Sequence, residues 1–323
     1  MIFHNGSYYY CENCHGQRGI RVRKSSTIAA IGQDPGKVVW TAPAGRKNSK
    51  SIWAPELHRI QGRWFIYYAA DDGRNANHRM WVLEGLTNDP QGPYRCCGQL
   101  QTGGWAIDGT VLALENGRMY FVWSGWPGKR DGLQNLYIAP MSDPATIAGP
   151  RHFLCKPDQP WERTGMPICE GPQVLQRNGS VFIIYSASAS WTPEYCLGML
   201  SLSNGEPLHS RAWRKHAHPV FSPTEHVWGV GHCSFVKSPC QTQDWILYHS
   251  KSQKTYGWED RDVHAKQFTW TAEGFPHFGT PPPRAASLLS PMTIKEPDSL
   301  ISLGVPLTIA GTEKCLTLNA AHV

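Results

Sequence analysis

The chain has 323 residues, of which 41% are hydrophobic and 14 are tryptophan, a composition that supplies a packed core and excludes intrinsic disorder. Its formal net charge of +6 comes from 31 basic and 25 acidic residues that are scattered without a basic run, which argues against nucleic-acid binding. No apolar stretch reaches the roughly 18 residues that a membrane helix needs, and residues 1–6 lack the basic and apolar regions of a signal peptide.

One hairpin pattern recurs five times along the chain, each time as a turn followed by an aromatic and β-branched run. The turns lie at residues 4–6, 61–63, 116–118, 178–180 and 242–244, and the runs at residues 8–10, 64–68, 119–123, 181–185 and 245–248. The copies are roughly 55 to 65 residues apart, which suits a four-stranded propeller blade with long loops. Helical periodicity is almost absent, so the sequence predicts an all-β, five-bladed β-propeller.

The turns and loops between these runs predict where recognition takes place. Asn-Gly at residues 5–6, 116–117 and 178–179 predicts type I′ hairpin turns, because both central residues of that turn need a positive φ. Loops rich in Gly, Pro, Trp and charged residues are expected at the rim of a site. They cover residues 42–51, 71–78, 124–135, 188–195 and 252–262.

The domain organisation follows from the extent of the repeat. Residues 1–290 are predicted to form one propeller, and residues 291–323 form a tail that carries no further copy of the hairpin pattern. The tail either covers the propeller or has no role. The ten cysteines do not form the dense framework of a small secreted domain, so most are expected to be buried thiols, with one or two disulfides possible.

Two acidic residues precede the third and fourth runs in unusual local sequence. Asp108 lies in Ala-Ile-Asp-Gly-Thr and Glu170 in Cys-Glu-Gly-Pro. Propeller geometry would bring both to the central axis from neighbouring blades, and two carboxylates on one pocket floor are what glycosidic cleavage needs. In isolation each residue reads as an ordinary turn or loop residue, but the surrounding repeats favour the catalytic interpretation.

Other candidate residues are aromatic or basic. His232 is flanked by small residues, and at the hub of a propeller its imidazole could hold water or a cation, although a lone histidine is more often a core residue. Trp53, Trp105, Trp126 and Trp191 lie in or beside the rim loops, where indole could stack on sugar rings, while about half of the tryptophans are expected to pack between blades.

These motifs resemble glycoside hydrolase family 43, whose members are five-bladed propellers with a carboxylate triad in the central funnel. The matching segments are residues 51–58, 106–110, 170–173, 185–188, 191–198 and 231–238, and they occur in the expected order. The resemblance implies that Glu170 is the general acid, that Asp108 tunes its pKa, and that His232 is associated with a calcium or sodium ion. It implies no organic cofactor.

The chain departs from the family pattern at its start. Family members carry a general-base Asp in an Asp-Pro phrase before the first strand, and no such phrase precedes His4-Asn5-Gly6 here. An inverting mechanism needs that carboxylate roughly 6.5–9.5 Å from the acid, and general-base catalysis contributes about 10² to 10⁴ in rate. Three explanations stay open: the chain lacks its true start, it is a glycan-binding relic, or an unusual residue substitutes for the base. We favour the first and therefore expect the 323-residue chain to be nearly inactive.

The substrate expectation comes from loop similarity. Residues 71–80 and 188–195 are similar to those of exo-acting α-L-arabinofuranosidases, which implies an arabinose-containing plant polysaccharide as the partner, and Ser188 in the second loop is expected to bind sugar. Arg261 could donate a fork of hydrogen bonds to sugar hydroxyls, with a surface role as an equal alternative. β-Xylosidase, endo-arabinanase, a non-catalytic carbohydrate-binding propeller and a protein-interaction propeller stay open as alternatives. The sequence further predicts an extracellular monomer that binds neither nucleic acid nor membranes.

Overall fold

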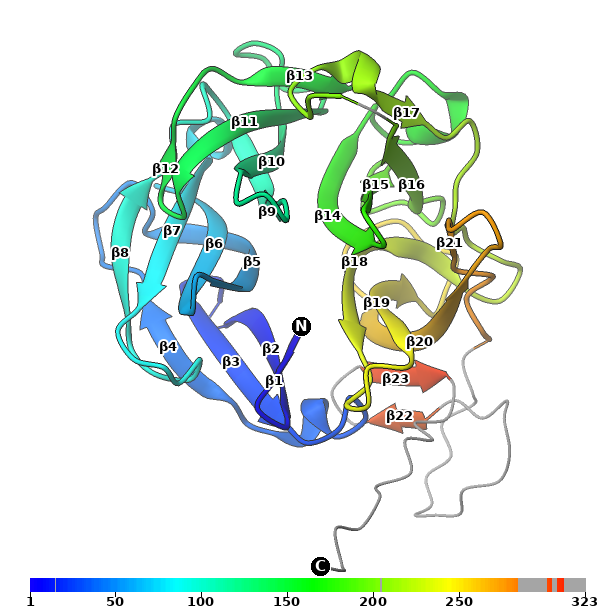
Figure 1. Ribbon diagram of the computed structural model, residues 1–323, viewed down its shortest axis with the longest axis horizontal. Coiled ribbons are helices and arrows are strands. Elements are labelled where there is room, and N and C mark those ends of the chain that lie inside the picture. The colour runs from blue at the N-terminus through cyan, green and yellow to red at the C-terminus, as the bar shows by residue number, and fades with distance from the viewer. Residues whose placement is uncertain (15, 204, 284–300, 304–306, 311–323) are drawn as a thin grey trace, which may run out of the picture.

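The computed structural model describes residues 1–14, 16–203, 205–283, 301–303 and 307–310. Five β-sheets are arranged in a ring around a central axis, which confirms the predicted five-bladed β-propeller (Figure 1). The described residues contain no α-helix, only four short 3-10 turns. No helix in this part of the chain is long and apolar enough to cross a membrane.

Each blade follows the chain, with its first strand at the hub. The first blade contains β1 (Ile2–His4), β2 (Ser7–Cys14), β3 (Gly19–Ser25) and β4 (Lys37–Thr41), and the second contains β5 (Lys50–Ile60), β6 (Arg63–Asp71), β7 (Arg79–Gly85) and β8 (Tyr94–Gln99). The third contains β9 (Ala106–Ala113), β10 (Met119–Gly125), β11 (Asn135–Asp143), β12 (Thr146–Ile147) and β13 (His152–Cys155). The fourth contains β14 (Cys169–Arg177), β15 (Ser180–Ala187), β16 (Cys196–Leu202) and β17 (Trp213–Lys215).

The fifth blade begins with β18 (Trp228–Lys237), β19 (Asp244–Lys251) and β20 (Arg261–Trp270), and β21 (Pro276–His277) pairs with β20. Two short strands from beyond residue 290, β22 (Ile301–Leu303) and β23 (Leu307–Ala310), extend this sheet, with β23 parallel to β20. Part of the predicted tail therefore pairs with the propeller, and the rest of it lies outside the described residues.

The five recurring turns are the hairpins that join the first strand of each blade to the second. Asn5 and Asn178 have φ of 47° and 49° and are each followed by a positive-φ glycine, as a type I′ turn requires. The expectation for residues 116–117 is wrong in detail, because only Gly117 has a positive φ and the connection runs over residues 114–118. Leu114 N–H donates to the Arg118 carbonyl there, which closes a longer loop.

The hydrophobic core consists of five separate clusters, one at each interface between neighbouring blades. The aromatic runs supply these clusters because the second strand of a blade lies between two neighbouring sheets and is buried on both faces; every residue of β10, for example, is buried. The ring closes between the first and fifth blades, where Tyr8 packs with Trp245 and its hydroxyl donates to the Lys237 carbonyl at 3.1 Å.

Candidate active site

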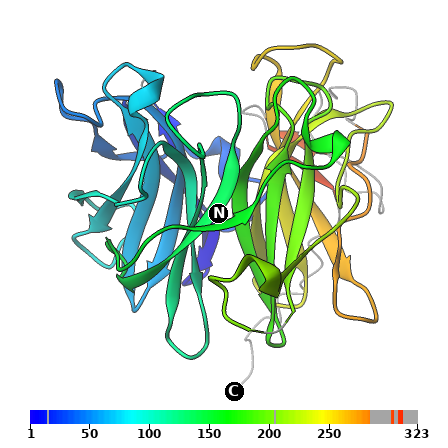
Figure 2. The ribbon, with the colours of Figure 1, turned by 90° about the horizontal axis from the view of Figure 1, so that it is seen from above.

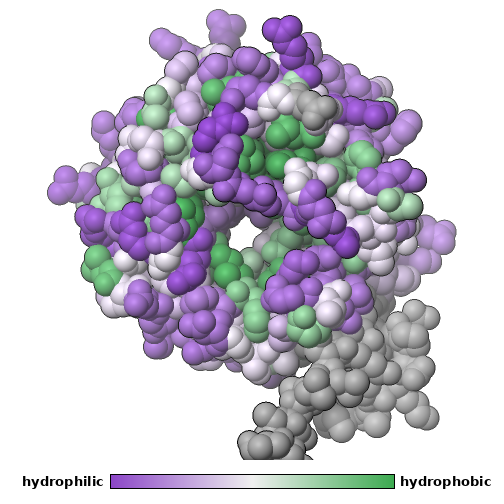
Figure 3. Space-filling view, viewed as in Figure 1, coloured by the Kyte–Doolittle hydropathy of each residue, from purple (hydrophilic) through white to green (hydrophobic). Residues whose placement is uncertain are grey.

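One end of the propeller carries the long loops and the other carries the hairpin turns (Figure 2). The strand registers place the loops at residues 42–49, 72–78, 126–134, 188–195 and 252–260 at the end where β9, β14 and β18 begin. The hub strands of these blades begin at the loop end, so Asp108 and Glu170, near the starts of β9 and β14, lie toward that end of the propeller. Figure 3 shows the opening of a channel at the centre of the ring.

A β-bulge interrupts the hub strand in each of the second to fifth blades, close to the axis. The registers of β5, β9, β14 and β18 with their neighbours shift at these points. The bulges contain residues in the left-handed region, namely Ala54, Asp108, Gly171 and His232, with φ of 41°, 56°, 54° and 51°. Bulges at the rims of closed sheets re-aim side chains, and these turn the hub strands toward the axis.

The structure brings Asp108 and Glu170 together, as the sequence predicted. Asp108 Oδ2 accepts a hydrogen bond of 3.0 Å from the backbone N–H of Gly171, the residue that directly follows Glu170. The two residues are 4% and 7% exposed, so both carboxyl groups lie in nearly dry surroundings. Glycine is needed at position 171 because its φ is positive and an added Cβ would lie 3.2 Å from His232 Nδ1.

The surroundings of the two carboxyl groups shift their pKa values. Burial, and then the negative charge of Asp108, raise the pKa of Glu170 to about 8. Burial also raises the pKa of Asp108, but the nearby His232 and the hydrogen bond from Gly171 N–H oppose that shift. Two close carboxyls cannot both ionise cheaply, and the pKa of about 8 makes Glu170 the member of the pair that carries a proton at neutral pH.

Two further side chains act on Glu170. The hydroxyl of Tyr195 donates a 2.8 Å hydrogen bond to Glu170 Oε1, and the Tyr195 ring stacks on His249 with 5.4 Å between centroids. The positive charge of Arg261 lowers the pKa of Glu170, and Arg261 Nε donates to the Trp258 carbonyl at 3.1 Å. The sequence predicted Arg261 near the sugar but gave no role to Tyr195, which lies within a segment already recognised.

A second polar layer lies next to Asp108. Glu56 raises the pKa of Asp108, so the two carboxyls are close, and Glu56 also accepts hydrogen bonds from His58 Nε2 at 2.8 Å and from Gln173 Nε2. The Met1 amino group is within electrostatic range of Glu56 and donates to Ser234 Oγ at 2.8 Å. Nothing in the Ala-Pro-Glu sequence around Glu56 indicates that its carboxyl would lie close to Asp108.

His232 lies at the hub, where the sequence placed it, and its backbone N–H donates to Ser186 Oγ at 2.8 Å. Within the described residues no group of three or more His, Cys, Asp and Glu side chains is arranged to hold a metal ion. Calcium takes six to eight oxygen ligands. A single imidazole does not supply that set, so an ion near His232 would have to be held largely by water.

The predicted tryptophans fall into two groups. Trp105 and Trp126 are 4% and 3% exposed and stack on each other at 4.6 Å, an arrangement that offers no free face to a sugar. Their burial favours a packing role, contrary to the expectation of exposed rim residues. Trp53 and Trp191 are half-buried; Trp53 stacks on His78 with centroids 3.9 Å apart.

Ser188, also predicted to contact sugar, is fully buried and has φ of 70°. Its hydroxyl donates to the Trp161 carbonyl and accepts from Thr164 N–H, both at 2.9 Å. These contacts join the loop at residues 188–195 to the segment that precedes Glu170. Ser188 therefore positions the rim of the site.

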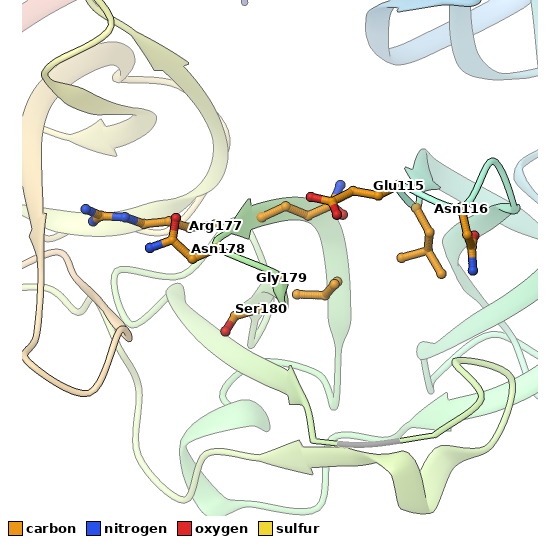
Figure 4. A pocket seen from close by; sticks show the side chains of 9 residues that line it. Glu115, Asn116, Arg177, Asn178, Gly179 and Ser180 are labelled. Carbon is orange, nitrogen blue, oxygen red and sulfur yellow. The ribbon is translucent and has the colours of Figure 1, made fainter.

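A pocket of about 370 Å³ lies at the opposite end of the propeller, between the hairpin turns of the third and fourth blades (Figure 4). Its walls include Glu115, Asn116, Arg177 and Asn178. Because Asp108 and Glu170 occupy the other ends of β9 and β14, this pocket is separate from the carboxyl pair.

The model of the family described as Glycosyl hydrolases family 43 matches residues 1–276. The chain belongs to this family. It is 34% identical over 292 residues to "Alpha-L-arabinofuranosidase 43" of Humicola insolens and 34% identical over 289 residues to "Extracellular exo-alpha-(1->5)-L-arabinofuranosidase" of Streptomyces avermitilis. Both matches cover 86% of the chain and 60% of the relative, so the chain spans about three fifths of the length of these proteins.

A crystal structure of alpha-L-arabinofuranosidase from Lactobacillus brevis superimposes with a TM-score of 0.82 at 32% identity, covering 87% of this chain and 93% of that protein. The endo-arabinase of Bacteroides thetaiotaomicron matches with a TM-score of 0.64 at 17% identity, which shows the shared fold alone.

Proposed function

We propose that the chain is a glycoside hydrolase that releases L-arabinofuranose from arabinan or arabinoxylan side chains with inversion of configuration. The observation that carries this proposal is the buried pair of Glu170 and Asp108, in which Glu170 has a pKa of about 8. A carboxyl group that stays protonated at neutral pH can donate its proton to a departing glycosidic oxygen.

Each member of the pair has one task. Glu170 donates its proton to the oxygen that leaves the anomeric carbon, and Tyr195 keeps the carboxyl oriented through the hydrogen bond to Oε1. Asp108 keeps the proton on Glu170 through its negative charge and is itself fixed by Gly171 N–H. As the bond breaks, the negative charge of Asp108 also stabilises the positive charge that develops on the sugar ring.

The choice of sugar rests on the relatives. The proteins from Humicola insolens, Streptomyces avermitilis and Lactobacillus brevis, each more than 30% identical to this chain, are all named arabinofuranosidases. Two related proteins from Streptomyces are named extracellular, which supports an extracellular location here. β-Xylosidase and endo-arabinanase are the alternatives within the family, and we retain the monomer as a prediction.

Water activation is the step that the described residues support least. Glu56 is the third carboxyl next to the pair, but His58 and Gln173 already hydrogen-bond to it. β1 pairs with β2 only from Ile2 to His4, so residues 10–14 of β2 have no strand partner on the hub side among the described residues. An extended segment along this edge would reach the loop end of the channel, where Glu170 lies.

The decisive experiment measures arabinose release and binding on the same preparation. The 323-residue chain is assayed with 4-nitrophenyl α-L-arabinofuranoside and with arabino-oligosaccharides, while calorimetry measures oligosaccharide affinity. Release from the arabino-oligosaccharides that disappears in Glu170→Gln supports the hydrolase. Binding without release, even after an Asp-containing extension is added before Met1, would instead support a non-catalytic carbohydrate-binding propeller.

We also propose a calcium or sodium ion near His232, held largely through water. The mechanism above does not use it. An anomalous-scattering map of crystals grown with calcium tests this proposal, and density that fits only water at the hub would end it.

A further inference from the structure

We propose that the loop at residues 252–260 carries an aromatic subsite, formed by Trp258 and Tyr256, for the sugar units on the leaving-group side of the scissile bond. This inference rests on the proposed function. The two residues are 56% and 67% exposed, and both lie on the loop that joins β19 to β20 at the rim of the channel. Among the described residues five large hydrophobic side chains are exposed, and these two lie only two positions apart on one loop.

The loop is held in shape by buried polar contacts. Lys251 is fully buried, and its Nζ donates to the carbonyl oxygens of Thr255 and Gly257 at 2.5 and 2.6 Å. Asp260 accepts from the backbone N–H groups of Ser252 and Gln253, both at 2.9 Å. A buried lysine costs free energy unless it is paired, so this arrangement fixes the loop instead of leaving it free to move.

The same loop is fastened to the neighbouring blade. Gly257 N–H donates to the Trp191 carbonyl at 2.8 Å, and Trp258 Nε1 donates to Ser190 Oγ at 3.1 Å. The Trp191 ring meets the Trp258 ring edge-on, with centroids 5.4 Å apart. Because Trp258 is supported from one side, its remaining exposed surface is a rigid apolar face, which is the form in which indole binds sugar rings.

The position of the loop relative to Glu170 decides which part of the substrate it contacts. Trp258 contacts Ser190 and Trp191 in the loop at residues 188–195. Tyr195, in the same loop, donates to Glu170 Oε1 at 2.8 Å, so Trp258 lies on the side of the channel that holds Glu170. Arg261 Nε also donates to the Trp258 carbonyl at 3.1 Å. A general acid protonates the oxygen shared with the leaving group, so the leaving sugar lies on the side of Glu170. Aromatic residues on that side bind the polysaccharide that remains after arabinose departs.

The experiment compares Trp258→Ala and Tyr256→Ala with the parent chain on arabino-oligosaccharides of increasing length and on 4-nitrophenyl α-L-arabinofuranoside. Loss of one stacking partner is expected to reduce kcat/KM on the longest oligosaccharide about tenfold and to reduce it less on the single-sugar substrate. Trp258→Phe, which keeps an aromatic face, restores most of the loss. Phe153→Ala is the matched control, because Phe153 is 44% exposed on an outer strand, and it leaves both rates unchanged.

Binding to the same oligosaccharides, measured by calorimetry, separates this inference from the proposed function. If the parent chain binds oligosaccharides but releases no arabinose, and its affinity falls about tenfold in Trp258→Ala, the subsite is supported and the hydrolase proposal is contradicted. A parent chain that releases arabinose, with equal rates and affinities in Trp258→Ala, overturns the subsite alone. A parent chain that binds no oligosaccharide at all overturns the subsite as well.

Discussion

Replacing Tyr195 by phenylalanine tests how the protein sets the pKa of its proposed acid. The Tyr195 hydroxyl donates to Glu170 Oε1 at 2.8 Å, and this hydrogen bond lowers the pKa of Glu170 because it favours the ionised carboxylate. Tyr195→Phe keeps the ring that stacks on His249 and removes the hydroxyl that donates to Glu170. The pKa of Glu170 should therefore rise above about 8 in the variant.

The size of the shift follows from the strength of one hydrogen bond to a charged group. Such bonds contribute about 1.5–3 kcal/mol, and one pKa unit corresponds to about 1.4 kcal/mol. Tyr195→Phe should thus raise the pKa of Glu170 by about 1 to 2 units. Since the acid acts in its protonated form, the pH at which kcat/KM begins to fall should move upward by the same amount.

Two measurements check this prediction. The pH dependence of kcat/KM is recorded on an unactivated arabino-oligosaccharide, and ¹³C NMR of labelled glutamate follows the Glu170 carboxyl directly, with Glu170→Gln for assignment. Tyr120→Phe is the matched control, because the Tyr120 hydroxyl donates to Glu206 at 2.6 Å on a different part of the fold. A Glu170 pKa that stays the same or falls in Tyr195→Phe would refute the reasoning.

Three further results are expected. Glu170→Gln should abolish turnover of unactivated substrates and keep oligosaccharide binding. It should also raise the melting temperature more at pH 8 than at pH 5, because a carboxyl whose pKa is raised in the folded protein destabilises the fold as the pH increases toward that value. Equal gains in melting temperature at both pH values would contradict the pKa argument. If the chain lacks a base, azide should speed release from the nitrophenyl substrate and form arabinosyl azide, whereas an unchanged rate and product would show that water is already activated. Gly109→Ala should lower the melting temperature by several degrees, because its Cβ would lie 2.1 Å from the buried Phe121 ring. Gly128→Ala, which has open space around it, should leave the melting temperature unchanged. Equal melting temperatures for the two variants would show that the packing around Phe121 can relax.

The repeat that predicted the fold is visible in sequence because it is local. An Asn-Gly turn followed by an aromatic run describes a single hairpin, and five such hairpins at similar spacing are enough to predict the blades. The prediction of a type I′ turn at residues 116–117 was wrong because the turn type depends on where the flanking strands end. Ending β9 at Ala113 leaves a five-residue connection in which only Gly117 needs a positive φ.

The site was only partly predictable because its residues meet across blades. Asp108 and Glu170 could be paired in advance, since each precedes a copy of the repeat. The roles of Trp105 and Ser188 depend on burial, and the structure places both inside the protein. Tyr195 and Trp258 acquire roles only through partners on other strands or on a neighbouring blade, and no spacing along the chain reveals those contacts.

The bulges connect the fold to the chemistry. Asp108 and His232 adopt positive φ in the middle of hub strands, a conformation that costs about 1–3 kcal/mol per residue in most contexts. A regular strand would alternate its side chains and leave the Gly171 N–H in the ladder, so that it could not reach Asp108 Oδ2. The local strain thus provides the hydrogen bond that holds Asp108 beside Glu170. The hub strands are also packed into the blade interfaces, through residues such as Ile107, Cys169 and Val230, and this packing holds the strained segments in place.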